Sequence, residues 1–131
     1  MIIAVDFDGC LCENAWPNIG KAHENVIACL KERQKAGDQI ILWTCRDGLL
    51  LAAAVAWCER RGLKLDAVND NLPERKREFG GNCRKVSADE YWDDRAVTVI
   101  DGEVPMEHRK PKEEKQYFGR RKEDGRHGPP V

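Results

Sequence analysis

Several features that would assign this 131-residue chain to a special class of protein are absent from its sequence. Its apolar runs are far shorter than the roughly 20 residues that a membrane-spanning helix requires, and it has no internal repeat. Acidic and basic residues are nearly balanced, at 23 and 22, which argues against a surface dedicated to nucleic acid or to a membrane. We therefore expect one globular domain with one core.

Paired cysteine motifs are also absent, although the chain has six cysteines. None of them forms a Cys-x-x-Cys pair, and several lie in apolar segments, where a thiol behaves as a small hydrophobic side chain. This pattern predicts reduced thiols rather than a disulfide framework or a zinc site. The first strand is predicted to begin at Met1, which leaves no room for a signal peptide, so we expect a cytoplasmic protein.

The start of the chain carries the strongest functional signal. An apolar run from Ile2 to Val5 leads directly into Asp6, and Asp8 follows two positions later, before Gly9. Such a run is typical of a strand buried in a parallel sheet, and ligands of open α/β sheets bind at the carboxyl ends of strands. Two carboxylates there repel, and Mg²⁺ is the cation that their hard oxygens favour. Alternatively, both aspartates are ordinary turn residues.

Strand and helix patterns alternate along the rest of the chain. This alternation predicts a parallel α/β sheet with right-handed crossovers. The expected elements after the first strand are a loop at 10–21, a helix from 22 to 35, a strand at 39–43, a helix at 49–61, a strand at 65–68, a short helix at 73–79, an extended segment from 85 to 92, and a last strand at 96–100.

The composition changes near Gly102, where proline and charged residues become frequent. We therefore predict one domain at 1–103, followed by a charged, proline-containing tail at 104–131 that is mobile. Tyr117 and Phe118 are the only large hydrophobic cluster of this tail, and they could dock on the body.

Four groups with phosphoryl-transfer chemistry fall at or near predicted strand ends: the Asp6/Asp8 pair, Thr44, Lys85, and the Asp93–Asp94 pair. A carboxylate can act as nucleophile, and a second carboxylate can protonate a leaving group and later activate water. A hydroxyl and an ammonium group can hold phosphoryl oxygens. Each group alone has an ordinary structural explanation, such as a helix cap or a solvated lysine. Their order and placement together make the combination specific.

These residues resemble the four signature motifs of the haloacid dehalogenase superfamily, over residues 2 to about 100. The region from Lys85 to Arg95 is similar to that of the 5′(3′)-deoxyribonucleotidases, and the body resembles small bacterial members without a cap domain. The resemblance implies a three-layer Rossmann-like fold. Cys10 departs from the pattern, which usually has threonine or valine there, and this affects local packing only.

The resemblance also implies the role of each residue. Asp6 would be the nucleophile, Asp8 the general acid and base, and Thr44 and Lys85 would hold the phosphoryl group. Mg²⁺ would be bound by Asp6, the backbone carbonyl of Asp8, and Asp93, with Asp94 just outside the ligand set. The superfamily's dehalogenases lack the second aspartate, so Asp8 implies phosphatase or phosphotransferase chemistry.

Neither gap in which this superfamily inserts a cap domain is long enough to hold one, so the site should be open, covered by loops or by another subunit. Arg46, Asn69 and Asn71 are candidate substrate-binding residues by position, although both asparagines could equally be turn formers. Lys85 requires a bend near 87–89, because a straight strand of eight residues would span roughly 26 Å. Without that bend, Lys76 or Arg84 becomes the candidate cation.

The sequence therefore predicts a Mg²⁺-dependent phosphohydrolase whose substrate is a sugar phosphate, a nucleotide or a phosphorylated macromolecule. A homo-oligomer is compatible with this prediction. The alternative is a non-catalytic module that binds a phosphorylated ligand, although such a module needs no nucleophile with an acid. A phospho-accepting receiver also uses aspartate, threonine and lysine at strand ends, but the order of these residues differs here.

Overall fold

The computed structural model describes residues 1–112 of the chain. Its elements, in order, are β1 (Ile2–Val5), β2 (Cys12–Ala15), β3 (Asn18–Ala22), α1 (Glu24–Lys35), β4 (Gln39–Leu42), α2 (Gly48–Arg60), β5 (Ala67–Val68), α3 (Pro73–Phe79), β6 (Glu90–Trp92) and a 3₁₀ helix, η1 (Met106–His108). By contacts the chain divides into two units, residues 1–93 and 94–131.

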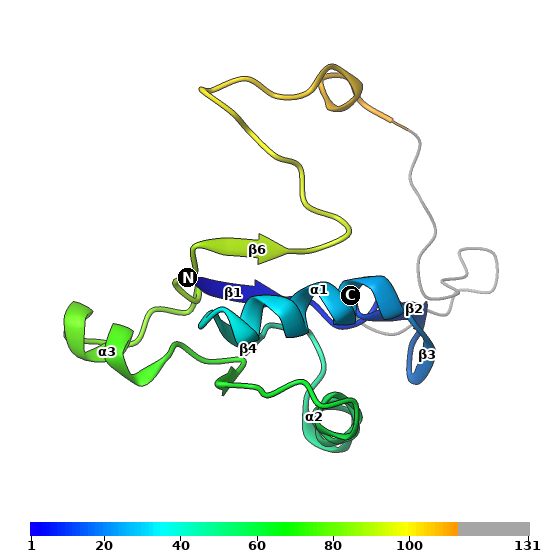
Figure 1. The fold of residues 1–131 in the computed structure, drawn as a ribbon. Coiled ribbons are helices and arrows are strands. Elements are labelled where there is room, and N and C mark those ends of the chain that lie inside the picture. Colours follow the sequence, from blue (N-terminus) through cyan, green and yellow to red (C-terminus); the bar gives the residue numbers. More distant parts are fainter. Residues whose placement is uncertain (113–131) are drawn as a thin grey trace. The chain divides into compact units, whose positions relative to one another are not determined.

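The first unit is built on a four-stranded parallel sheet with the strand order β5-β4-β1-β6. β1 lies between β4 and β6, and Val5 at its carboxyl end pairs with Leu42 on one side and Trp92 on the other. Figure 1 shows β1 and β6 side by side and running in the same direction. The predicted α/β fold with a parallel sheet is confirmed, and the carboxyl ends of three strands meet at one edge.

One face of the sheet packs against α1 and α2. Alternate strand residues point to this face, as the two-residue period of a strand requires. The larger core cluster contains strand residues Ile3, Val5, Ile40 and Leu42 together with Ile27 and Leu30 of α1 and Ala54, Trp57 and Cys58 of α2. Phe7, two residues after the end of β1, packs edge-on against Trp57 with ring centroids 5.2 Å apart.

The opposite face of the sheet has a smaller apolar cluster. It contains Ile2, Ala4 and Ile41 from the strands, with Leu72 and Val86 from the connections. α3 follows Leu72 but has no buried residue of its own. This face of the sheet is therefore covered mainly by residues of the connecting segments, whereas the other face is covered by two helices.

The prediction of a loop at 10–21 was wrong, because this segment forms the antiparallel hairpin of β2 and β3. The helix that was expected from residue 22 consequently begins two residues later, at Glu24. Gly20 makes the hairpin possible, since a Cβ atom built there would lie only 2.2 Å from the carbonyl oxygen of Glu13. In Figure 1 the hairpin lies beyond the carboxyl end of β1, at the opposite end of the sheet from α3.

The prediction of a last strand at 96–100 was also wrong. Within the described part of the second unit, residues 96–99 belong to no strand, and Ile100 forms only an isolated bridge with Glu103. Val97, Val99 and Ile100 are exposed. The alternation of apolar side chains in this segment favours a strand, but a strand forms only where a neighbour supplies hydrogen-bond partners.

The contact division after Asp93 precedes the boundary expected from composition, which remains a prediction. Tyr117 and Phe118, which were expected to be able to dock on the body, lie outside the described residues. Among residues 1–112, no helix is both long enough and apolar enough to cross a membrane. All six cysteines are free thiols, with Cys12 and Cys58 buried.

Candidate metal centre and its surroundings

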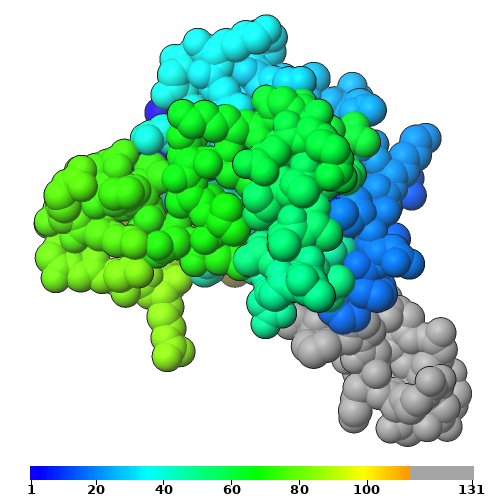
Figure 2. Space-filling model, turned by 90° about the horizontal axis from the view of Figure 1, so that it is seen from below, coloured from blue at the N-terminus to red at the C-terminus, as the bar shows by residue number. Residues whose placement is uncertain are grey.

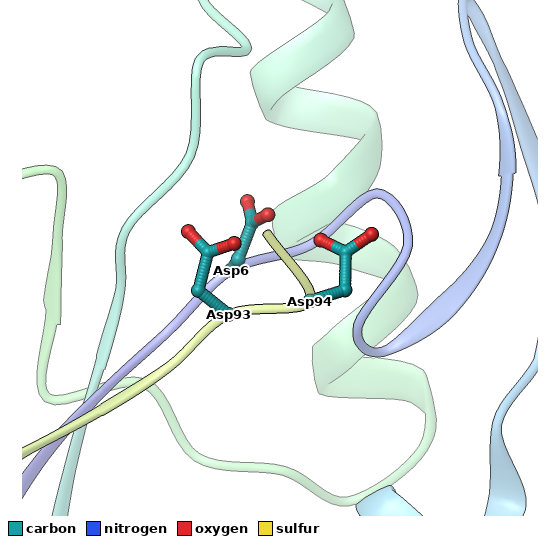
Figure 3. Close-up of side chains that lie close together, drawn as sticks. All are labelled: Asp6, Asp93 and Asp94. Atoms are coloured by element: carbon teal, nitrogen blue, oxygen red, sulfur yellow. The ribbon is translucent and has the colours of Figure 1, made fainter. Parts of the chain in front are cut away.

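Asp6 and Asp93 are brought together by the pairing of β1 with β6. Asp6 directly follows β1 and Asp93 directly follows β6, and the Asp6 N–H donates a 2.9 Å hydrogen bond to the Trp92 carbonyl. Asp6, Asp93 and the adjacent Asp94 each offer a carboxylate oxygen, and these three oxygens all lie within 4.8 Å of one another. Figure 3 shows Asp6 and Asp93 side by side, with their carboxylates on the same side of the two chain segments.

This three-carboxylate cluster suits a hard divalent cation. Two unit charges 4.8 Å apart repel by about 1 kcal/mol in water and by about 3–4 kcal/mol at an effective dielectric constant near 20. A bound cation would turn this repulsion into attraction, and an all-oxygen donor set with open positions is the type that Mg²⁺ favours. Asp6 is half-buried, whereas Asp93 and Asp94 are exposed. The sequence had placed Asp94 just outside the ligand set, and the structure brings its carboxylate into the cluster.

The Asp8 carboxylate is not part of this cluster, because it pairs with Arg46. Arg46 Nε donates to Oδ2 of Asp8 and Nη2 donates to Oδ1, each at 2.8 Å. The Arg46 side chain is 1% exposed and that of Asp8 is 10% exposed. Arg46 was a candidate substrate-binding residue, but here its guanidinium is occupied inside the protein.

Thr44 lies close to the predicted position, two residues beyond the carboxyl end of β4. Its backbone N–H donates to Oδ1 of Asn69 at 2.8 Å, and its hydroxyl oxygen accepts a 3.2 Å bond from the backbone N–H of Arg46. A hydroxyl that accepts one bond still has its own proton to donate. Thr44 is half-buried, so this proton could reach a phosphoryl oxygen at the mouth of the sheet.

The two asparagines hold loops in place. Asn69 has a left-handed backbone (φ 50°), and its Nδ2 donates to the Arg46 carbonyl, so its side chain spans the turn that carries Thr44. Asn71 is 3% exposed; its amide donates to Asn82 and to the Cys83 carbonyl, and its oxygen accepts from the Ser87 N–H. These bonds support the alternative that both asparagines are turn formers rather than substrate-binding residues.

The bend required for Lys85 is present. The Tyr91 hydroxyl donates a 2.6 Å bond to the Val86 carbonyl, which folds the segment before β6 back onto that strand. The Lys85 ammonium lies 5.4 Å from the centre of the Tyr91 ring. Tyr91 is in β6, two residues before Asp93. The alternative cation Lys76 pairs with Asp70 at 2.6 Å. That Lys85 binds the phosphoryl group stays a prediction.

The pairing of Arg46 with Asp8 and the part that the hairpin plays in it were not predicted from the sequence. Arg46 also donates to the carbonyls of Pro17 and Asn18 in the hairpin turn and of Leu50 in α2. Two signals were available: an arginine in a loop between buried elements needs an anionic partner, and Pro17-Asn18 is a turn sequence between short polar and apolar alternations.

A conserved protein from Bacteroides thetaiotaomicron of known structure is similar to this chain. The two are 43% identical, and the match has a TM-score of 0.67 and covers 74% of this chain and 78% of that chain. No protein-family model matches this chain, and no curated protein matches it either.

Proposed function

This chain belongs to the same family as that conserved Bacteroides thetaiotaomicron protein. Because the description of that protein names no activity, we propose a function from the site itself. The proposal is that the chain is a Mg²⁺-dependent phosphohydrolase of the haloacid dehalogenase type, which cleaves phosphate monoesters through an aspartyl-phosphate on Asp6. The single observation that carries it is the meeting of Asp6 and Asp93 at adjacent strand ends, with Asp94 completing a three-carboxylate cluster.

The other groups near this edge support the proposal. Thr44 offers a hydroxyl proton at the end of β4, and Lys85 offers an ammonium group on the β6 side. Thr44 would donate to a phosphoryl group above Asp6, and Lys85 is the cation proposed to approach it from the β6 side. β1 lies between those two strands in the sheet, so the expected nucleophile is central to the arrangement.

The chain's residues would act in two steps. In the first, an oxygen of Asp6 forms a bond to phosphorus as the ester bond breaks, and the leaving alkoxide takes a proton from the carboxyl group of Asp8. In the second, the Asp8 carboxylate takes a proton from water as the water oxygen attacks phosphorus, which releases phosphate and restores Asp6. Thr44 and Lys85 bind the equatorial oxygens in both steps.

The three carboxylates of the cluster fit the Mg²⁺ ion that this scheme requires. Asp6, Asp93 and Asp94 would hold Mg²⁺, which when bound would screen the negative charge of the phosphoryl group from the carboxylates around it. Because Arg46 is paired with Asp8, the cation and not Arg46 would screen the charge of the phosphoryl group.

Phosphate release tests the proposal. Wild type and Asp6→Asn are assayed on a panel of sugar phosphates, nucleotides and p-nitrophenyl phosphate, each with Mg²⁺ and with EDTA. We expect wild type to turn over substrate with Mg²⁺ but not with EDTA. Asp6→Asn should have no turnover in either condition, because an amide is a poor nucleophile. Activity that survives Asp6→Asn would refute the aspartyl-phosphate route.

A non-catalytic phospho-ligand module is the second candidate, and one observation favours it. Both oxygens of Asp8 accept bonds from Arg46, so this carboxylate is engaged within the protein. A module of this kind predicts that phosphate esters bind, as measured by calorimetry, but that no ester of the panel is hydrolysed.

A further inference from the structure

We infer that Arg46 is a positioning residue: it orients Asp8 for proton transfer and links that orientation to the β2–β3 hairpin. This inference rests on the proposed function, because Asp8 is the acid and base of that scheme. It assigns to Arg46 a task other than substrate binding.

The pair is bidentate, since Nε and Nη2 of Arg46 each donate a 2.8 Å bond to a different oxygen of Asp8. Two parallel bonds between a planar guanidinium and a planar carboxylate set the orientation of the carboxylate, whereas a single bond sets only a distance. Lysine, with a point charge on a flexible stem, cannot reproduce this geometry. Arg46 therefore determines where the oxygens of Asp8 lie.

The guanidinium itself is held from three directions. Its Nη2 donates to the Asn18 carbonyl at 3.0 Å, and its Nη1 lies 3.3 Å from the Pro17 carbonyl and 3.4 Å from the Leu50 carbonyl. Its central carbon lies 5.0 Å from the centre of the Phe7 ring. The carbonyls come from the hairpin and from α2, and Figure 2 shows these two elements directly beside each other.

The two charges are mutually dependent because both are nearly excluded from water. The Arg46 side chain is 1% exposed, and a buried charge that loses its partner is strongly destabilised. Asp8 therefore has one preferred position as long as the hairpin turn and the start of α2 keep the guanidinium in place. A displacement of the hairpin would move Asp8, although the hairpin provides no side chain to the three-carboxylate cluster.

The test uses the full chain and compares wild type, Arg46→Lys, Asp8→Asn and the double variant. For Arg46→Lys we expect kcat to fall by about 10- to 100-fold on an alkyl phosphate, because a misplaced acid cannot protonate a poor leaving group. The fall should be smaller on p-nitrophenyl phosphate, and KM should stay near its wild-type value. Rates are divided by the folded fraction, determined by circular dichroism.

The double variant separates positioning from a merely structural role. If Arg46 acts through Asp8, adding Arg46→Lys to Asp8→Asn should lower kcat no further. Independent, multiplicative effects would overturn the inference, as would an Arg46→Lys variant with wild-type kcat on both substrates. Arg61→Lys is the matched control, because Arg61 stacks on Trp57 at the far end of α2, and we expect its kcat to be unchanged.

A measurement on the wild-type fold covers the case in which Arg46→Lys does not fold. The Nε–H proton of Arg46 should give a slowly exchanging NMR signal that shifts or disappears in Asp8→Asn, and an unaffected signal would overturn the inference. Failure of the proposed function is recognised separately, because wild type would then match Asp6→Asn in having no turnover. That result would remove the shared premise before any Arg46 variant is compared.

Discussion

The side chain of Asn69 holds Thr44 in place: its Oδ1 accepts a 2.8 Å bond from the Thr44 N–H, across 25 positions of sequence. The same side chain donates to the Arg46 carbonyl. One amide group thus fixes both ends of the turn that follows β4. This turn carries the proposed phosphoryl-binding hydroxyl and the arginine that pairs with Asp8.

Replacing Asn69 with alanine should therefore lower the free energy of unfolding by about 2–3 kcal/mol. Two hydrogen bonds account for about 1 kcal/mol each, and the left-handed backbone, which asparagine tolerates better than alanine, accounts for the rest. Urea unfolding measures the change. Asn14→Ala is the control, because Asn14 is exposed and its one bond, to the Trp16 N–H, is 3.4 Å long. Equal losses in both variants would contradict the role given to Asn69.

Asp93→Asn should remove the response of the protein to Mg²⁺, because it takes away one of the three carboxylates of the proposed site. Mg²⁺ should raise the melting temperature of wild type but not that of the variant, because ligand binding stabilises the folded state. Glu32→Gln, at an exposed position of α1, should behave as wild type. Equal Mg²⁺ responses in Asp93→Asn and wild type would rule out this site.

Gly20→Ala should disrupt the hairpin, since its Cβ would overlap the backbone of Glu13 at 2.2 Å. We expect a clear fall in melting temperature and, through Arg46, a lower kcat for the folded protein. Gly81→Ala is a matched control, because a Cβ there would meet nothing within 4 Å and Gly81 has no positive φ. A normal melt for Gly20→Ala would show that the hairpin can rearrange at little cost.

Burial raises the pKa of the Cys58 thiol to about 12, from an ordinary value of 9.0. The folded state then keeps its proton where the unfolded state loses it, so this contribution to stability is complete below pH 9 and declines as the pH rises towards 12. Between pH 8 and pH 10 the free energy of unfolding of wild type should fall by about 1.4 kcal/mol more than that of Cys58→Ala. The measurement is urea unfolding at both pH values. Cys29→Ala, which removes an exposed thiol, should parallel wild type.

Local sequence was sufficient for the central strands and the two long helices. β1 and β4 are short apolar runs whose alternate residues face two different apolar clusters, and this pattern is visible without any knowledge of the fold. Asp6 was expected at a strand end because it directly follows such a run, and Asp93 because it follows a segment that was expected to be extended. A bend between Lys85 and Tyr91 was also expected, because a straight strand would keep Lys85 far from Asp93, whereas the approach of Lys85 to that carboxylate stays a prediction.

Only the tertiary structure determined which extended segments pair as strands and which polar side chains form hydrogen bonds with each other. Residues 12–22 form a hairpin although a loop was expected there, whereas 96–99 remain outside any strand although they alternate as a strand does. The pairing of Arg46 with Asp8 joins residues 38 positions apart. Periodicity reports which face of an element is buried, whereas a hydrogen bond between distant segments depends on where the whole chain places them.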